Sequence, residues 1–190
     1  MPELLERHRD RLRRMVDLRL DWRLRGRLDP SDVLQEAYLD ASGRLDDYLS
    51  DPKLPPFLWL RLIVGERLTN LHRHHLGSKM RDAGRELSLY RGAIPEASSA
   101  DLAARLLGRL TRPSEAAVRD ETKLRLQEAL NSLEPLDREV LALRHFEQLS
   151  TAEAAQVLGI KEAAAGKRYL RALKRLKDVL TKLPGGLESV

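Results

Sequence analysis

The chain has 190 residues, of which 33% are charged, 4% are aromatic and none is cysteine, with a formal net charge of +5. The lack of cysteine excludes disulfides and thiolate metal sites, and no apolar run is long enough to cross a bilayer or to form a signal peptide. We therefore expect a cytoplasmic protein that enters no membrane. Leu, Ala, Arg and Glu dominate without strand-like alternation, which predicts an all-α fold, and the basic excess is compatible with nucleic acid or an acidic partner.

The first predicted helix covers residues 2–24 and carries an apolar stripe of leucines and valine. Nine arginines and three aspartates lie between Arg7 and Arg27, so the other face of this helix is strongly basic. A charged face of this kind is either a solvated surface or a binding surface, and the residues alone favour neither.

A second helix is predicted from Pro30 to about Leu49, with Asp29 or Ser31 as its cap. The prolines of "SDPKLPP" then predict a loop. A third helix follows over residues 57–76, and the glycine directly after it is a natural stop.

Residues 78–112 mix Gly, Ser, Ala and Pro with short apolar clusters, which indicates a linker with one short helix near residues 101–110. A second compact unit follows, and it contains two helices, over residues 114–131 and 135–145, before a final pair. We predict two small helical domains joined by a linker, with boundaries 1–77, 78–112 and 113–183.

The segment "TAEAAQVLGIKEAAAGKRYLRALKRLK" (residues 151–177) predicts a small-residue helix, a turn at Gly159 and a densely basic helix. Seven basic side chains and one acid lie between Lys161 and Lys177. At 100° per residue, the apolar side of this helix collects Tyr169, Leu173, Leu176, Leu180 and Ala165. Two helices joined in this way form a helix-turn-helix, whose second helix enters the major groove. The candidate DNA contacts are Lys161, Ala164, Lys167, Arg168, Arg171 and Lys174; the alternative is an ordinary basic surface helix.

A family resemblance extends over both halves of the chain. "LDREVLALRHFEQLSTAEAAQVLGIKEAAAGKRYLRALKRLK" resembles the C-terminal DNA-binding domain of extracytoplasmic-function sigma factors. "DPSDVLQEAYLDA" is similar to the D-x-x-D-L-V-Q-E segment of that family, and "FLWLRLIVGERLTNLHRHH" resembles its W-L-x-x-I-A helix. The arginine-rich "LRRMVDLRLDWRLRGRLDPSD" resembles members from planctomycete-like bacteria.

The resemblance implies a factor that binds core RNA polymerase and directs it to promoters. Its C-terminal domain would read the −35 element as duplex, and its N-terminal domain the −10 element as a melted strand. Segments like "DVLQE" dock on the polymerase clamp, which makes Asp32, Gln35 and Glu36 the candidate contacts. The implied partners are core RNA polymerase, through its clamp and flap regions, promoter DNA and an anti-sigma factor.

The third predicted helix is the candidate surface for the melted strand. Trp59, Glu66, Asn70 and Arg73 lie within about 60° of one another on it. An aromatic ring, an amide and cations on one face suit unstacked bases and phosphates. The candidate −10 contacts are Trp59, Arg61, Arg67, Asn70, Arg73 and His74. Glu66 stands where the family often has Asn, and the loop "DDYLSDPKLPP" corresponds to a family segment that holds a flipped base.

Two other functions compete with this one. A stand-alone helix-turn-helix regulator would need neither the "DVLQE" segment nor a strand-binding helix. An enzyme, such as a metal-assisted phosphodiesterase using "HRHH" (residues 72–75), is the weakest alternative, because no nucleophile–base pair, phosphate loop or acidic metal cluster supports it. We predict no catalytic residue, no metal site and no cofactor.

Overall fold

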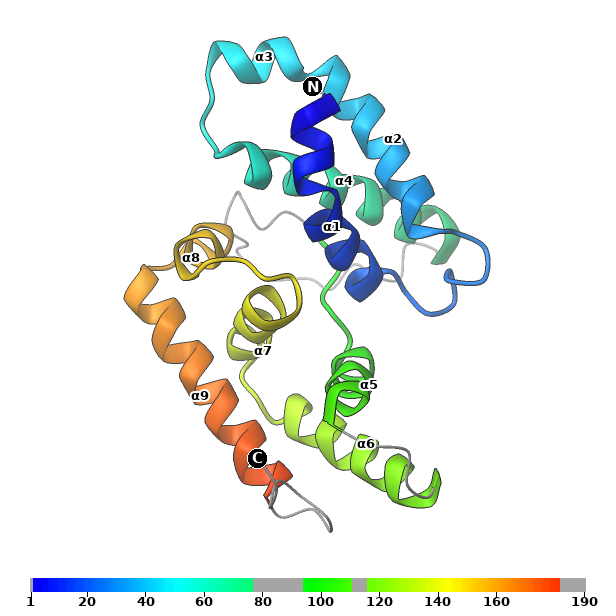
Figure 1. Ribbon diagram of the computed structural model, residues 1–190, viewed down its shortest axis with the longest axis vertical. Coiled ribbons are helices and arrows are strands. Elements are labelled where there is room, and N and C mark those ends of the chain that lie inside the picture. The colour runs from blue at the N-terminus through cyan, green and yellow to red at the C-terminus, as the bar shows by residue number, and fades with distance from the viewer. Residues whose placement is uncertain (1, 77–93, 111–115, 182–190) are drawn as a thin grey trace. The chain divides into compact units, whose positions relative to one another are not determined.

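The computed structural model describes residues 2–76, 94–110 and 116–181 (Figure 1). The regular elements in these ranges are all helical, which confirms the predicted all-α fold. The chain divides into two compact units, one of residues up to Glu96 with Ala155–Ile160, the other of Ala97–Ala154 with the residues from Lys161 on. Gly77, the expected helix stop, and most of the predicted linker lie outside the described residues, so the domain boundaries stay a prediction. None of the described helices is long and apolar enough to cross a membrane.

Three helices form the core of the first unit: α1 (Pro2–Arg19), α2 (Pro30–Gly43) and α4 (Pro56–Leu76). They pack against one another, and the short α3 (Leu45–Ser50) contacts α2 (Figure 1). The largest fully buried side chains in this unit are aliphatic or thioether groups of α1, of the turn after it and of α4: Leu12, Met15, Leu18, Leu20, Leu60, Ile63 and Leu68. Their burial is the main favourable contribution to folding of this unit.

Helix α1 ends at Arg19, earlier than the predicted residue 24. The Asp21 carboxylate accepts a hydrogen bond from the backbone N–H of Arg23 at 2.9 Å, which offers the backbone an alternative to the helix. Arg25 donates to the backbone carbonyls of Leu20 and Asp17, which lie at the end of the helix. Leu20 and Leu24 remain buried after the helix has stopped, so the turn is anchored to the core.

Helix α2 begins with Asp29 as its cap, since the Asp29 carboxylate accepts from the backbone N–H of Ser31 at 2.7 Å. It ends at Gly43 and does not continue to residue 49 as predicted. Arg44 leaves the helical conformation, with φ −106° and ψ 5°, and its guanidinium reaches Glu66 of α4 at 2.7 Å. Glycine disfavours a helix interior, so the break falls beside the residue where continuation is least favourable.

The segment after the undescribed stretch returns to the first unit. A Cβ on Gly65 of α4 would lie 2.5 Å from the side chain of Ile94, so only glycine allows this approach. The buried Arg19 donates to the backbone carbonyl of the next residue, Pro95, at 2.9 Å. The extended residues Ile94 and Pro95 are therefore fixed across α1 and α4.

The second unit consists of α5 (Ser99–Leu110), α6 (Ala116–Asn131), α7 (Pro135–Leu141), the π-helix η2 (Ala142–Phe146) and α9 (Glu162–Leu180), while α8 (Thr151–Leu158) spans the boundary between the units. Helix α5 packs on α6, and α9 packs on α6 and α7. The predicted helix 135–145 thus changes to a wider turn at Ala142, where Glu147 N–H donates to the Ala142 carbonyl at 3.0 Å. Ala142, Leu143 and Phe146 all stay buried in this wider turn.

The protonation of a buried histidine makes the stability of the first unit depend on pH. The Nε2 atom of His72 in α4 accepts the backbone N–H of Asp21 at 3.3 Å, so the ring is neutral, and its Nδ1 has no hydrogen-bond partner among the described residues. Burial lowers the pKa of His72 below the ordinary 6.5, although the charge of Asp21 opposes this and that of Arg23 adds to it. The unfolded chain therefore binds this proton more tightly than the folded chain.

We expect the stabilisation from His72 to be fully present above pH 6.5 and to be lost as the pH falls below that value, because protonation removes the acceptor for Asp21. Thermal unfolding measured between pH 7.5 and 5 should show this slope in the wild-type protein. His72→Gln keeps an acceptor but does not titrate, so its melting temperature should depend less on pH. His75→Gln, at an exposed position of the same helix, is the control; an equal change of slope in both variants would contradict the assignment.

Candidate nucleic-acid interface

The final helix pair has the local geometry of a helix-turn-helix. Ser150 Oγ accepts from Glu153 N–H at 3.0 Å, and the Glu153 carboxylate accepts from Ser150 N–H at 2.7 Å, so α8 starts in a capping box. Gly159 takes φ 64°, as the predicted turn requires. Lys161 is the N-cap residue of α9, and a Cβ on Gly166 would lie 3.9 Å from the Thr151 methyl group, so the starts of α8 and α9 lie close together.

The packing side of α9 is rotated by about 40° from the predicted one, and Ala165 and Leu176 belong to both. Ala165, Ala172 and Leu176 are buried, whereas Tyr169 and Leu173 are only half-buried at its edge. The shift follows from the small residue Ala172, which allows close packing on this line. On the opposite side, Lys167, Lys174 and Leu170, which is 66% exposed, face solvent. Ala164 is half-buried and Lys161 is exposed.

Two of the predicted DNA contacts are engaged inside the second unit. Arg168 Nη1 lies 2.6 Å from Asp137 Oδ1 and 3.0 Å from Glu134 Oε2. Arg171 Nη1 lies 3.4 Å from the other oxygen of Asp137 and 3.8 Å from Glu134. The Asp137 side chain is only 2% exposed, so its charge needs such partners. The hydrogen bond that Arg168 donates to Asp137, followed by the one it donates to Glu134, raises the pKa of Arg168, which remains charged.

These contacts separate the basic residues of α9 into two groups. Arg168 joins α9 to the beginning of α7 and holds the angle between them. Arg171 is 58% exposed and contacts the same carboxylates at longer distances, so part of its guanidinium remains open to solvent. Lys167 and Lys174 are exposed beside Arg171, and a phosphate can approach them directly.

A cavity of about 370 Å³ opens at the beginning of α4. The Trp59 ring stacks on Tyr48 of α3, with centroids 4.2 Å apart and planes inclined by 16°. The Tyr48 hydroxyl donates to the backbone carbonyl of Leu54 at 2.8 Å, which fixes the loop between α3 and α4. Both rings line the cavity together with Arg44, Asp47, Asp51, Lys53, Leu54 and Leu62. The predicted loop therefore lies beside an aromatic pair, which suits an unstacked base, and two cations. Both cations are paired with carboxylates, Lys53 with Asp51 at 3.1 Å and Arg44 with Glu66.

The other predicted −10 residues divide into an exposed group and two residues with roles inside the first unit. Arg61 is 2% exposed, so its selection as a strand contact is corrected: it lies on the side of α4 that packs into the core. Arg67 is paired with Glu36 of α2, and Arg73 donates to the Asn70 side chain. Asn70, Arg73 and His74 are exposed, as the helical spacing predicted.

The candidate polymerase contacts share one exposed face of α2. Asp32, Gln35 and Glu36 are all exposed, and Glu36 is held by Arg67. Leu39 follows them at the same helical spacing and is 74% exposed. Residues i, i+3, i+4 and i+7 form a stripe on a helix, so Leu39 belongs to this face. Sequence reasoning missed Leu39, although the same helical wheel could have found it, as it could have found Leu170 on α9.

The histidines of residues 72–75 do not converge. His72 is buried against Asp21, whereas His74 and His75 are exposed and meet edge to face with centroids 4.8 Å apart. Within residues 2–76, 94–110 and 116–181, no group of three or more His, Asp or Glu side chains is placed to hold a metal ion.

Comparison with known proteins decides the family. Residues 123–176, which include α7, α8 and most of α9, match the family described as Sigma-70, region 4. The ECF RNA polymerase sigma factor SigD of Mycobacterium tuberculosis is 30% identical over 176 residues, which are 93% of this chain and 74% of SigD. The chain belongs to the ECF family of RNA polymerase sigma factors. This ECF sigma factor is also 29% identical to the RNA polymerase sigma-E factor of Streptomyces avermitilis, over 80% of its own length and 72% of that protein.

Solved structures agree with the fold of the ECF sigma factor. CnrH, in complex with the cytosolic domain of CnrY, matches with a TM-score of 0.50 and 24% identity over 95% of this chain and 86% of CnrH. The sigma factor RpoE of Bartonella quintana, in complex with the anti-sigma factor NepR, matches with a TM-score of 0.50 and 17% identity over 95% and 96%. The sequence relatives make this protein a factor for promoter-specific transcription initiation, in preference to a stand-alone regulator.

We expect Asp137→Asn to lower the free energy of unfolding by about 2 kcal/mol, because it removes a buried charge from its arginine partners. Urea unfolding of the full chain measures this. Glu121→Gln is the control, since the Glu121–Arg125 pair is exposed on α6 and its loss should cost less than about 0.5 kcal/mol. If both variants lose the same small free energy of unfolding, the pairing of Asp137 with the arginines does not stabilise the packing of α9.

Proposed function

We propose that this ECF sigma factor binds core RNA polymerase with the exposed face of α2, reads duplex −35 DNA with α9 and holds the melted −10 strand along α4. The proposal rests on the cationic outer side of α9. This helix directly follows a capped helix and a glycine turn. A catalytic group has no part in this function, and no cofactor is needed. The proposal includes action in the cytoplasm, where polymerase works, and membership of the planctomycete-like subgroup.

For the −35 element, Lys167 and Lys174 bind phosphates on the outer side of α9. Leu170 lies between them and can contact a thymine methyl group, which is an apolar feature of the major groove. Lys161 and Ala164 lie at the beginning of the helix, where residues approach base edges. Arg171 contributes its solvent-open side, and Arg168 acts by positioning α9 through Asp137.

For the −10 element, the cavity beside Trp59 and Tyr48 receives an unstacked base, with Arg44 and Lys53 near its phosphate. Asn70, Arg73 and His74 continue this surface along α4, while Arg67 acts by holding Glu36. For polymerase, Asp32, Gln35 and Leu39 provide an acidic and apolar face for the clamp. The second unit binds the flap, and an anti-sigma factor is a further partner, as NepR is for the fold relative RpoE.

The proposed function is tested by adding the purified protein to core RNA polymerase and sequencing the starts of transcripts made from genomic fragments. Discrete start sites shared by a group of promoters are expected. The double variant Lys167→Glu/Lys174→Glu should lose start-site selection at least tenfold, because each reversed charge repels a phosphate. Lys123→Glu, at an exposed position on α6, should retain it. If the wild-type protein gives only the starts of core polymerase alone, the proposed function is wrong.

The α2 face gives a separate prediction. Asp32→Lys/Gln35→Lys should weaken association with core polymerase at least tenfold, because it places positive charge on the proposed docking face. Asp46→Lys/Ser50→Lys makes the same change in charge on α3 and should bind like the wild type. Affinity is measured by labelled-protein titration. Retained binding by the first variant would remove α2 from the interface.

A further inference from the structure

The turn between α1 and α2 presents a tryptophan to solvent. Trp22 is 72% exposed, although it lies between Leu20 and Leu24, which are both buried. The chain contains two tryptophans, and the other one is stacked on Tyr48. An exposed tryptophan contributes little apolar burial to folding, although the residues two positions before and after it are buried. An exposed aromatic side chain of this kind is typical of a binding surface.

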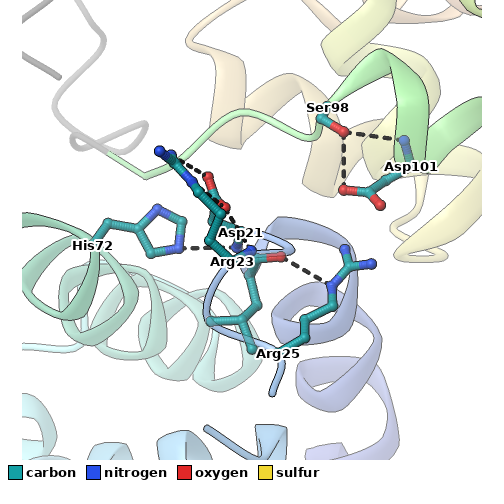
Figure 2. A network of polar contacts seen from close by, with 7 residues as sticks. Asp21, Arg23, Arg25, His72, Ser98 and Asp101 are labelled. Atoms are coloured by element: carbon teal, nitrogen blue, oxygen red, sulfur yellow. Dashed lines mark hydrogen bonds and ion pairs between the residues drawn. The ribbon is translucent and has the colours of Figure 1, made fainter. Parts of the chain in front are cut away.

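This turn is held in a fixed position. The backbone N–H of Leu24 donates to the Asp21 carbonyl at 2.9 Å, and that of Arg27 donates to the Leu24 carbonyl at 2.9 Å. Arg23 donates to both carboxylate oxygens of Asp21, at 2.9 and 2.8 Å (Figure 2). Trp22 is therefore attached to an ordered corner, and a partner that contacts it does not have to order the backbone first.

The corner is joined to the end of α4. Figure 2 shows the His72 ring pointing at the backbone of Asp21, which donates to its Nε2. The residues of α4 that follow His72 are Arg73, His74 and His75, and all three are exposed. One hydrogen bond thus joins the α1–α2 turn to the C-terminal end of α4. The basic residues at this end of α4 lie next to the turn.

The charge of this surface is positive. The exposed residues Trp22, Arg23, Arg25 and Arg27 of the turn, with Arg73 and His75 on either side of His72 around α4, form what we call the arginine corner. The turn holds two acids, of which Asp29 caps α2 and Asp21 pairs with Arg23. The hydrogen bond from Arg23 lowers the pKa of Asp21 to about 2, so this pair persists at neutral pH. Arginines around an exposed aromatic ring match the phosphates and sugars of nucleic acid.

We infer that the arginine corner is a second DNA-binding surface of the first unit, which contacts the duplex that flanks the melted −10 strand. The inference rests on the proposed function of α4. Trp59 and His72 are thirteen residues apart, which is about 20 Å along a helix and matches about six base steps of duplex. DNA that leaves the cavity at Trp59 and follows α4 therefore reaches the corner after a few base pairs. Trp22 contacts a sugar or base edge, and Arg27 and Arg73 bind phosphates.

Site-specific crosslinking in the holoenzyme tests this inference. Trp22 is replaced by p-benzoylphenylalanine, and the holoenzyme is irradiated on a promoter mapped by the transcription-start experiment. A crosslink to DNA is expected. The same replacement at Leu39, which is equally exposed on α2, should give a crosslink to polymerase and none to DNA. A crosslink from position 22 to protein alone, or no crosslink while transcription is normal, overturns the inference and leaves the proposed function intact.

Affinity measurements give a second readout. Trp22→Ala should weaken holoenzyme binding to the same promoter about tenfold, as expected for one lost aromatic contact to nucleic acid. Arg27→Gln should reduce the slope of log affinity against log salt by about 0.9, the value for one phosphate. Arg7→Gln, at an exposed arginine near the other end of α1, should change neither quantity. Unchanged affinity and slope in both corner variants would overturn the inference. The proposed function itself is wrong only if the wild-type protein directs no transcription starts beyond those of core polymerase alone.

Discussion

The packing of α4 between α1 and α2 is the constraint on which the first unit depends. One side of this helix is buried, and its remaining side chains hold neighbouring elements: Glu66 pairs with Arg44, Arg67 with Glu36, and His72 accepts from Asp21. The strand-binding candidates Trp59, Asn70 and Arg73 can lie outward only because these contacts fix the rotation of the helix. The geometry of the proposed −10 surface is therefore a consequence of core packing.

In the second unit, a buried carboxylate fixes the rotation of α9 about its own axis. Ala165, Ala172 and Leu176 bring α9 close to its neighbours, but small side chains alone allow a helix to rotate. Asp137 restricts this rotation, because its buried charge is satisfied only when Arg168 lies over it. A side chain that looks like a DNA ligand by charge thus has an internal role. The exposed lysines on the outer side are the proposed phosphate contacts.

Much of the fold could be predicted from periodicity and capping residues. The bounds of α4 and α8, the Asp29 cap and the glycine turn at residue 159 agree with prediction, because each depends on local chemistry. The early end of α1 could not be foreseen, since it requires the Asp21 side chain to compete for the backbone. Burial of Arg61 and pairing of Arg168 also escaped prediction. A helical wheel gives the direction of a side chain but not the element that packs against it.

The contact of Ile94 and Pro95 with the first unit shortens the free length of chain that follows this unit. The chain leaves this unit at Pro95, and only Glu96, Ala97 and Ser98 precede the first residue of α5. Four peptide steps span at most about 14 Å. A longer free connection to α5 would therefore require Pro95 to leave Arg19 and Ile94 to leave its contact with Gly65. A pull on the chain between α4 and α5 would thus act first on a single hydrogen bond and one half-buried isoleucine.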